Sequence, residues 1–318
     1  MALTTRFVRP DRRSFAVPHG GVRAILGDVK QSARTHRTTG HAAEMAFFAV
    51  LTLVPSTVAV GSALGLSQRV LGDSVVVQAE DAVIEAIRTL MGPELADEVI
   101  TPFVHAQLSQ PRGGVALGSL LIAWWLSMRL FESTGHAIDA AYGVEDRCPT
   151  FIARLLALGF ALGSVLLVAV TVEMMVVGPL GDPDSGPVAW LGLGDAYTIG
   201  WSVVRWPLLL LIVVAFLSSL YRFSPNVHLG WGDCIPGAVL GAALWIAAAV
   251  GFRLSAALGL RTSSGVAADD PAVALIGQSV NAVVATVLWA YLASVAILLG
   301  GEFNAALRAR RQAGAPEG

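Results

Sequence analysis

Charged residues are scarce in this sequence. Asp, Glu, Lys and Arg make up 14% of the 318 residues, whereas 55% are hydrophobic. A soluble domain of average composition carries about 25% charged residues. The mean hydropathy of +0.66 agrees with this deficit. The composition therefore argues against an ordinary soluble domain and indicates a protein that is embedded in lipid.

Cysteine is also scarce, the common catalytic motifs are absent, and we expect no cleavable leader. Cys148 and Cys234 lie far apart, so we predict neither a disulfide framework nor a metal site. The first 40 residues are polar and basic, with no apolar core before a small-residue cleavage site. No phosphate-binding loop, nucleophile elbow or His-Glu-x-x-His motif is found. We therefore expect no enzymatic activity, no ATP hydrolysis and no cofactor.

Long apolar stretches are abundant instead. A helix that crosses a bilayer needs about 20 mostly apolar residues. Six stretches qualify, at residues 42–66, 114–130, 151–177, 201–220, 235–258 and 280–301. Strands of a membrane β-barrel would be about half as long and would alternate strictly. The sequence thus predicts an all-α, polytopic membrane bundle of about six transmembrane helices.

The distribution of arginine and lysine predicts the orientation. Basic residues gather in the segment before the first stretch and after the last one, which the positive-inside rule places in the cytoplasm. An even number of spans allows both termini to be cytoplasmic. The segments then assigned to the outside are acidic, with seven Asp and Glu residues between positions 73 and 98. We expect a multi-pass protein of a bacterial inner membrane.

Three regions follow from this reading. Residues 1–40 form a basic cytoplasmic segment, residues 41–307 the six-helix membrane domain, and residues 308–318 a disordered cytoplasmic tail. Within the membrane domain, residues 67–112 form an insert outside the membrane. Apolar residues recur there at helical spacing, so we predict one or two amphipathic helices that cap a cavity or lie on the membrane surface.

Several short motifs, in order across residues 40–307, resemble the YihY/BrkB family of bacterial membrane proteins. The first is Met45-Ala46-Phe47-Phe48-Ala49-Val50-Leu51-Thr52-Leu53-Val54-Pro55, and the second is Ala140-Ala141-Tyr142-Gly143-Val144-Glu145-Asp146-Arg147. The others are Leu220-Tyr221-Arg222-Phe223-Ser224-Pro225 with Trp231, Pro236-Gly237-Ala238 with Leu244-Trp245, Leu288-Trp289-Ala290-Tyr291-Leu292, and Gly301-Glu302-Phe303-Asn304-Ala305. Two family glycines are replaced, in Gln278-Ser279-Val280-Asn281-Ala282, by Gln278 and Asn281.

The resemblance implies a six-helix inner-membrane protein with both ends in the cytoplasm. Members of the family have been called transporters, serum-resistance factors and, formerly, ribonuclease BN. A ribonuclease would need a soluble site and a basic RNA-binding surface. The basic N-terminal segment is better explained by topology and by anionic lipid, so we expect no nucleic-acid partner.

Ionisable residues within the spans are the first site candidates, because a charge in the membrane is costly. Glu44 lies near the start of the first span and could act in transport or reach the cytoplasmic interface. Glu173 lies toward the outer end of the third span, where it could bind a cation, carry a proton or simply meet water. Arg253 in the fifth span could pair with Glu173, grip an anionic group or extend to the outer surface.

A second group of candidates lies at the predicted cytoplasmic end. Spacings of three, four and three place four residues on one helix face, which we interpret as a gate, a proton relay or a solvated network of ion pairs: Arg129, Glu132, His136 and Asp139. Glu302 and Asn304 end the last span, and Glu302 paired with Arg222 or Arg154 would lock this end or form an inner gate. Pro55 and Pro236 are predicted to kink their helices.

Three functions remain open on this basis. The first is a permease, with cation/proton antiport as one form. The second is an exporter of lipid or another amphiphile, and the third is a scaffold for envelope assembly that transports nothing. Membrane lipids, a small cation or lipid substrate, and a second copy of the chain in a homo-oligomer are the partners that these functions would require.

Overall fold

The computed structural model describes residues 22–71, 113–144, 150–172, 174, 194–257 and 271–313. The described residues form long helices: α1 (Val22–Thr35), α2 (Thr38–Leu71), α6 (Gly113–Ala141), α7 (Thr150–Val172), α9 (Gly194–Phe223), α10 (Trp231–Ala257) and α11 (Pro271–Ala313). No strand occurs among these residues. The all-α prediction is confirmed.

Five of these helices contain stretches long and apolar enough to cross a membrane. The stretches are Thr38–Ala59, Phe151–Thr171, Gly200–Phe223, Trp231–Leu254 and Val283–Gln312. They lie in α2, α7, α9, α10 and α11. Large apolar side chains such as Val165, Leu166 and Leu211 are exposed along them, as expected for helices that face lipid. The chain is therefore a polytopic helical membrane protein.

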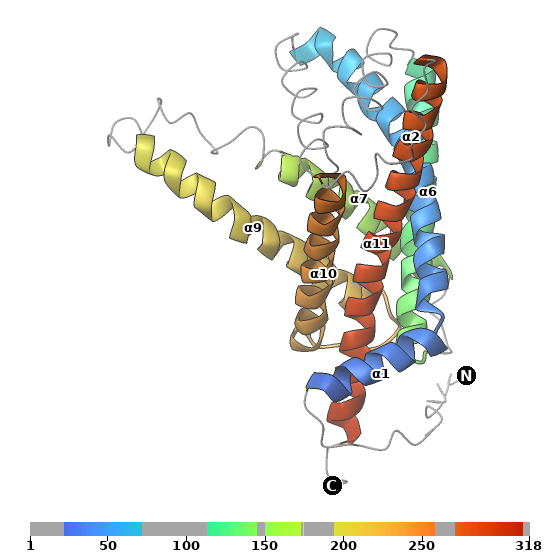
Figure 1. Ribbon diagram of the computed structural model, residues 1–318, viewed down its shortest axis with the longest axis vertical. Helices are drawn as coiled ribbons and strands as arrows, with labels where there is room; N and C mark the ends of the chain where they lie inside the picture. Colours follow the sequence, from blue (N-terminus) through green and yellow to red (C-terminus); the bar gives the residue numbers. More distant parts are fainter. Residues whose placement is uncertain are drawn as a thin grey trace, which may run out of the picture.

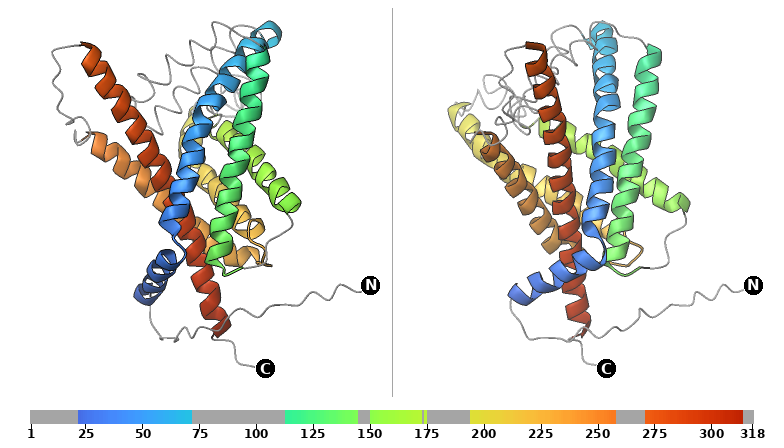
Figure 2. Two further views of the ribbon diagram at one scale, coloured as in Figure 1. Left: turned by 90° about the vertical axis from the view of Figure 1, so that its right-hand side faces the viewer. Right: turned by 45° about the vertical axis from the view of Figure 1, so that its right-hand side comes forward.

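The remaining predicted span, 114–130, corresponds to α6, which is not among those five stretches. Arg129, Glu132, His136 and Asp139 all lie in its second half. Nevertheless α6 packs along α2 and returns the chain to the end where α7 begins (Figures 1 and 2). The six helices from α2 to α11 thus alternate in direction, which matches the predicted topology.

The helices converge at one end of the bundle and diverge at the other. Figure 2 shows α9 and α10 leaning away from α2 and α6 toward the end that is remote from α1. At the converging end, α1 lies across the base, and the last turns of α11 pass beside it (Figure 1). We call this end, where α1 lies, the closed end.

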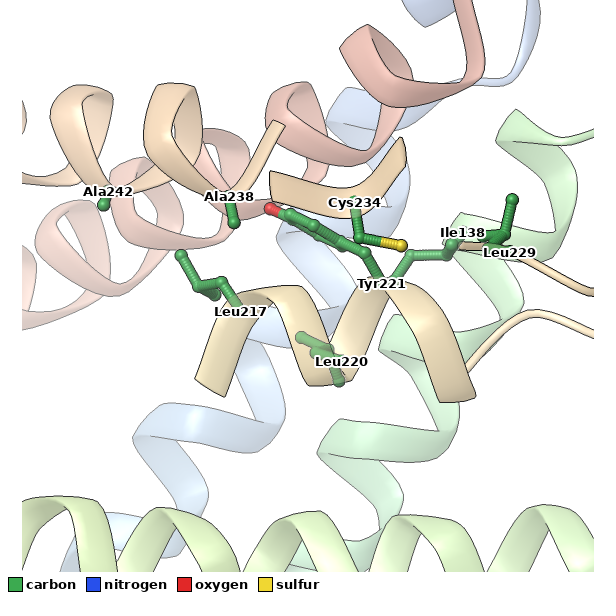
Figure 3. Close-up of a cluster of buried hydrophobic side chains, with 8 residues drawn as sticks. All are labelled: Ile138, Leu217, Leu220, Tyr221, Leu229, Cys234, Ala238 and Ala242. Atoms are coloured by element: carbon green, nitrogen blue, oxygen red, sulfur yellow. The ribbon is translucent and has the colours of Figure 1, made fainter. Parts of the chain in front are cut away.

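The main apolar core also lies near the closed end. Tyr221 is fully buried there, in a cluster formed by α6, α9, α10 and the α9–α10 connection (Figure 3): Ile138, Leu217, Leu220, Tyr221, Leu229, Cys234, Ala238 and Ala242. A second cluster of Ala42, Met45, Ala137 and Leu298 joins α2, α6 and α11. Among the described residues, both buried clusters therefore pack against the C-terminal half of α11, through Ile297 and Leu298.

The boundaries differ from the prediction at both ends of the chain. Residues 22–35 of the predicted basic segment form α1, and α2 starts at Thr38 and continues through Pro55 to Leu71. At the other end α11 extends to Ala313, so residues 308–313, predicted to be a disordered tail, are helical. Of the predicted insert, residues 67–71 belong to α2, and residues 72–112 lie outside the described part of the chain.

Candidate functional site

Glu302 on α11 is a carboxylate buried at the closed end, with only 2% of its surface exposed. Ser32 on α1 donates a hydrogen bond to Oε2 at 2.6 Å, and Thr38 at the start of α2 donates one to Oε1 at 2.9 Å. The Nδ1 atom of His36, in the turn between these helices, lies 3.2 Å from Oε1. A buried carboxylate needs such partners, because desolvation otherwise makes its charge very costly. Glu302 therefore ties α1 and α2 to α11.

Asn304, two residues further along α11, is buried against α10. Its Oδ1 accepts a hydrogen bond from the backbone N–H of Gly237 at 2.6 Å, and its Nδ2 donates one to the carbonyl of Cys234 at 2.9 Å. These two backbone groups flank Pro236, whose ring cannot donate to the helical ladder and displaces a preceding carbonyl. Asn304 thus binds the backbone of α10 at its proline.

Glu302 and Asn304 point to different sides of α11 because of helical geometry. Residues in an α-helix are about 100° apart around the axis, so a spacing of two separates the side chains by about 200°. One turn of α11 therefore holds α1 and α2 on one side and α10 on the other. We call Glu302, Asn304 and their partners Ser32, His36, Thr38, Cys234 and Gly237 the closed-end junction.

Close helix contact supports the Asn304 side of the junction. Gly237 and Gly241 of α10 face Gly300 of α11, and a Cβ atom on Gly300 would lie 2.5 Å from the carbonyl oxygen of Gly237. The hydroxyl of Tyr221 on α9 donates to the carbonyl of Ile297 on α11 at 2.6 Å. Small residues let backbones approach in this way, as is common where membrane helices associate. Helices α10 and α11 are therefore joined without an intervening layer of large side chains, and Tyr221 connects α9 to this seam.

Ion pairs surround the junction where α11 leaves the bundle. Arg310 binds Asp28 of α1, with Nη2 at 2.5 Å and Nε at 2.9 Å from Oδ2. Arg311 pairs with Asp233 in the first turn of α10. Such partly exposed pairs contribute little individually, but they fix α1 and α10 to the same segment of α11.

A second polar cluster lies where α6 is flanked by α2 and α7. Glu132 on α6 contacts Nη1 of Arg129 at 2.7 Å and Nε of Arg154 on α7 at 3.4 Å. The guanidinium of Arg129 also lies over the ring of Phe48 on α2, 5.6 Å from its centroid. These residues line a pocket of about 550 Å³ together with Trp125 and Met128.

The predicted four-residue face of α6 is divided among different surroundings. Arg129 and Glu132 belong to the pocket described above, whereas His136 is exposed. Asp139 is buried and accepts a hydrogen bond from the backbone N–H of Asn226 in the α9–α10 connection, at 3.1 Å. Arg129 and Glu132 thus face the pocket while Asp139 faces the α9–α10 connection, and the predicted role of the four residues as a gate or relay remains a prediction.

The other predicted site residues are also placed. Glu44 is half-exposed, with Oε2 3.9 Å from Nδ1 of His41. Arg253 is exposed on α10, and Glu173, its predicted partner, lies outside the described residues. The guanidinium of Arg222 lies over the rings of Phe223 and Trp231, at 5.5 and 4.8 Å from their centroids.

The predicted partners of Glu302 were wrong. Arg154 pairs with Glu132 and Arg222 stacks on aromatic rings, whereas the donors to Glu302 are Ser32 and Thr38, beside His36. These partners were missed because the first 40 residues were read only for their charge. The signal was present, since Val22, Ile25, Leu26 and Val29 recur at helical spacing and Ser32 and His36 continue that face.

The gene product thus combines long lipid-facing helices with a buried polar junction at one end, as expected of a multi-pass helical membrane protein. The chain belongs to the virulence factor BrkB family, whose profile matches residues 29–318. It is 25% identical over 282 residues to the ribonuclease-like protein YfkH of Bacillus subtilis, covering 87% of this chain and 92% of that protein. No solved structure matches it. The resemblance inferred from the motifs is confirmed.

Proposed function

We propose that this protein is an inner-membrane permease and that opening of the closed end is one step of its transport cycle. The closed-end junction carries this proposal. Glu302 and Asn304 hold α1, α2 and α10 together around a single turn of α11, while the helices diverge at the opposite end. A permease must expose its substrate site to one side at a time, and a junction that closes the described helices at one end is suited to that task.

The substrate is the second part of the proposal. An anionic amphiphile is favoured by the pocket between α2, α6 and α7, which combines two arginines with apolar walls. Cation/proton antiport remains the alternative, and it rests on Glu173. Neither form of transport requires hydrolysis of ATP by this chain.

The decisive test is to lock the closed end and measure transport. Ser32 and Glu302, which form a hydrogen bond, are replaced by cysteine in a background in which Cys148 and Cys234 are alanine. A short bifunctional thiosulfonate then joins α1 to α11 reversibly. The variant is reconstituted in proteoliposomes that report both translocation of a labelled phospholipid and cation-driven proton movement. The two single-cysteine variants, treated identically, serve as controls.

We expect the cross-link to abolish flux and a reductant to restore it, with the single-cysteine variants unaffected by the reagent. Flux that persists in the locked protein would show that the closed end is no gate. No flux of lipid, proton or cation by the unlocked protein would reject the permease and leave the scaffold role. Flux of protons with Na⁺, K⁺ or Li⁺ but none of lipid would select antiport, with Glu173→Gln as the next variant.

A further inference from the structure

The pocket between α2, α6 and α7 has an unusual charge arrangement. Glu132 is 11% exposed and lies between Arg129 and Arg154, whose side chains are 43% and 60% exposed. The carboxylate contacts one nitrogen of each guanidinium, and the three side chains together carry one excess positive charge. A guanidinium has five N–H donors in a planar fork. Each arginine therefore keeps donors that the carboxylate does not engage, on its exposed side.

Such donors suit a phosphate group. Arginine binds phosphate through two parallel charge-assisted hydrogen bonds, and the excess positive charge favours an anion. Glu132 holds both guanidinium groups in place, because it contacts Nη1 of one and Nε of the other. The cation–π contact of Arg129 with Phe48 further restricts that side chain. These contacts restrict the two arginine side chains before a ligand arrives, which lowers the entropic cost of binding.

The apolar part of the pocket indicates what else the ligand carries. Phe48, Trp125 and Met128 form the rest of its lining, and the side chain of Trp125 is exposed. Arg154 lies three residues beyond Phe151, where the apolar stretch of α7 begins. Arginine and tryptophan at the end of a span occupy the depth of the lipid headgroups. A free phosphate ion would contact the arginines but would leave these apolar walls unused.

We propose that this pocket binds the phosphate group of an anionic phospholipid, with its acyl chains along Phe48 and Trp125. Arg129 and Arg154 hold the phosphate, and Glu132 acts as a positioning residue for both. This inference deepens the proposed function and rests on it for the choice of substrate, because the same pocket favours an anionic amphiphile there. Binding is measured without transport, so a failure of the site and a failure of the permease can be told apart.

Binding is measured on the purified full chain in detergent micelles, by microscale thermophoresis. The probe is dioctanoyl phosphatidylglycerol. Dioctanoylglycerol tests the need for phosphate, and glycerol 3-phosphate tests the need for acyl chains. Arg154→Gln removes one phosphate contact, and Arg154→Lys keeps the positive charge but not the planar fork of N–H donors. Arg34→Gln is the matched control, because Arg34 is an exposed arginine on α1, away from this pocket.

We expect Arg154→Gln to weaken binding of phosphatidylglycerol about tenfold, the size typical of a hydrogen bond to a charged group. Arg154→Lys should fall in between, Arg34→Gln should bind as the parent does, and both probes that lack one half of the lipid should bind far more weakly. Equal binding of glycerol 3-phosphate would overturn the lipid assignment in favour of a soluble phosphate. Equal binding by folded Arg154→Gln and parent protein would overturn the site, independently of any transport result.

Discussion

Replacement of Asn304 by alanine should destabilise the bundle through α10. The side chain makes two buried hydrogen bonds, to the N–H of Gly237 and to the carbonyl of Cys234. Alanine cannot make either bond, and the backbone around Pro236 loses both side-chain partners. The lost contacts lie at the point where proline already weakens the helical ladder of α10.

The expected magnitude follows from these two bonds. An intramolecular hydrogen bond contributes about 0.5–1.5 kcal/mol net, and polar contacts between membrane helices average about 0.6 kcal/mol with a maximum of about 1.7 kcal/mol. Two bonds therefore contribute about 1–3 kcal/mol. Gln312→Ala, which removes an exposed amide from the same helix, should change the free energy of unfolding by less than about 0.5 kcal/mol.

The free energy of unfolding is measured by reversible titration of the protein in dodecyl maltoside micelles with sodium dodecyl sulfate. Hydrogen exchange adds the location of the effect, since amides near Gly237 should exchange faster in Asn304→Ala while those of α1 stay unchanged. A loss no larger than that of Gln312→Ala would refute the reasoning. Faster exchange spread equally over α1 and α10 would also contradict it, because both of these hydrogen bonds of Asn304 go to α10.

Other substitutions near the closed end should change the stability of the folded protein, some lowering it and one raising it. Tyr221→Phe removes a hydrogen bond and should lower the free energy of unfolding by about 1 kcal/mol. Tyr142→Phe should raise it slightly, because the buried Tyr142 hydroxyl has no hydrogen-bond partner among the described residues. Unfolding titrations of the two variants test both predictions. Burial also raises the pKa of Tyr142, so the folded state keeps this proton where the unfolded chain loses it. Stability should therefore fall as pH rises above about 10, less steeply in Tyr142→Phe, as alkaline thermal melts would show. Gly300→Ala should separate α10 from α11 and lower the melting temperature, unlike Gly251→Ala, whose added methyl meets no atom. Glu302→Leu should detach α1 and make it susceptible to limited proteolysis, whereas Glu302→Gln keeps a hydrogen-bond acceptor and should not. Equal cleavage of both variants would show that this acceptor does not hold α1 in place.

The spans were predictable because they depend on one local property. A run of about 20 apolar residues has few alternatives to a membrane helix, and five runs lie in helices that are apolar and long enough to cross. The end of α6 was also encoded locally. Gly143 adopts a φ of 64°, and the amides of Gly143 and Val144 bond to the carbonyls of Ala140 and Asp139, which is the helix-ending pattern that glycine favours.

The partners within the junction were not predictable, because they depend on packing between distant segments. Ser32 and Glu302 are separated by 270 positions, and Gly237 and Asn304 by 67. Pairing charges by sign alone favoured Arg154 or Arg222 for Glu302. The structure instead places the hydroxyl donors of Ser32 and Thr38 and the imidazole of His36 against the carboxylate. Sequence order placed Glu302 and Asn304 at the end of the last span but gave the wrong residues opposite Glu302.

The two sides of the closed-end junction differ in how readily they can separate. On the α10 side, Asn304 binds backbone groups and Gly237 approaches Gly300 so closely that no side chain fits between the helices. On the α1 side, Glu302 meets only side chains, one of which, His36, is 28% exposed and accessible to water. Water can replace hydroxyl donors at an exposed edge far more easily than it can enter a seam between two backbones. If the closed end opens during transport, α10 and α11 should therefore move as one body, and α1 with the start of α2 should separate from them at Glu302.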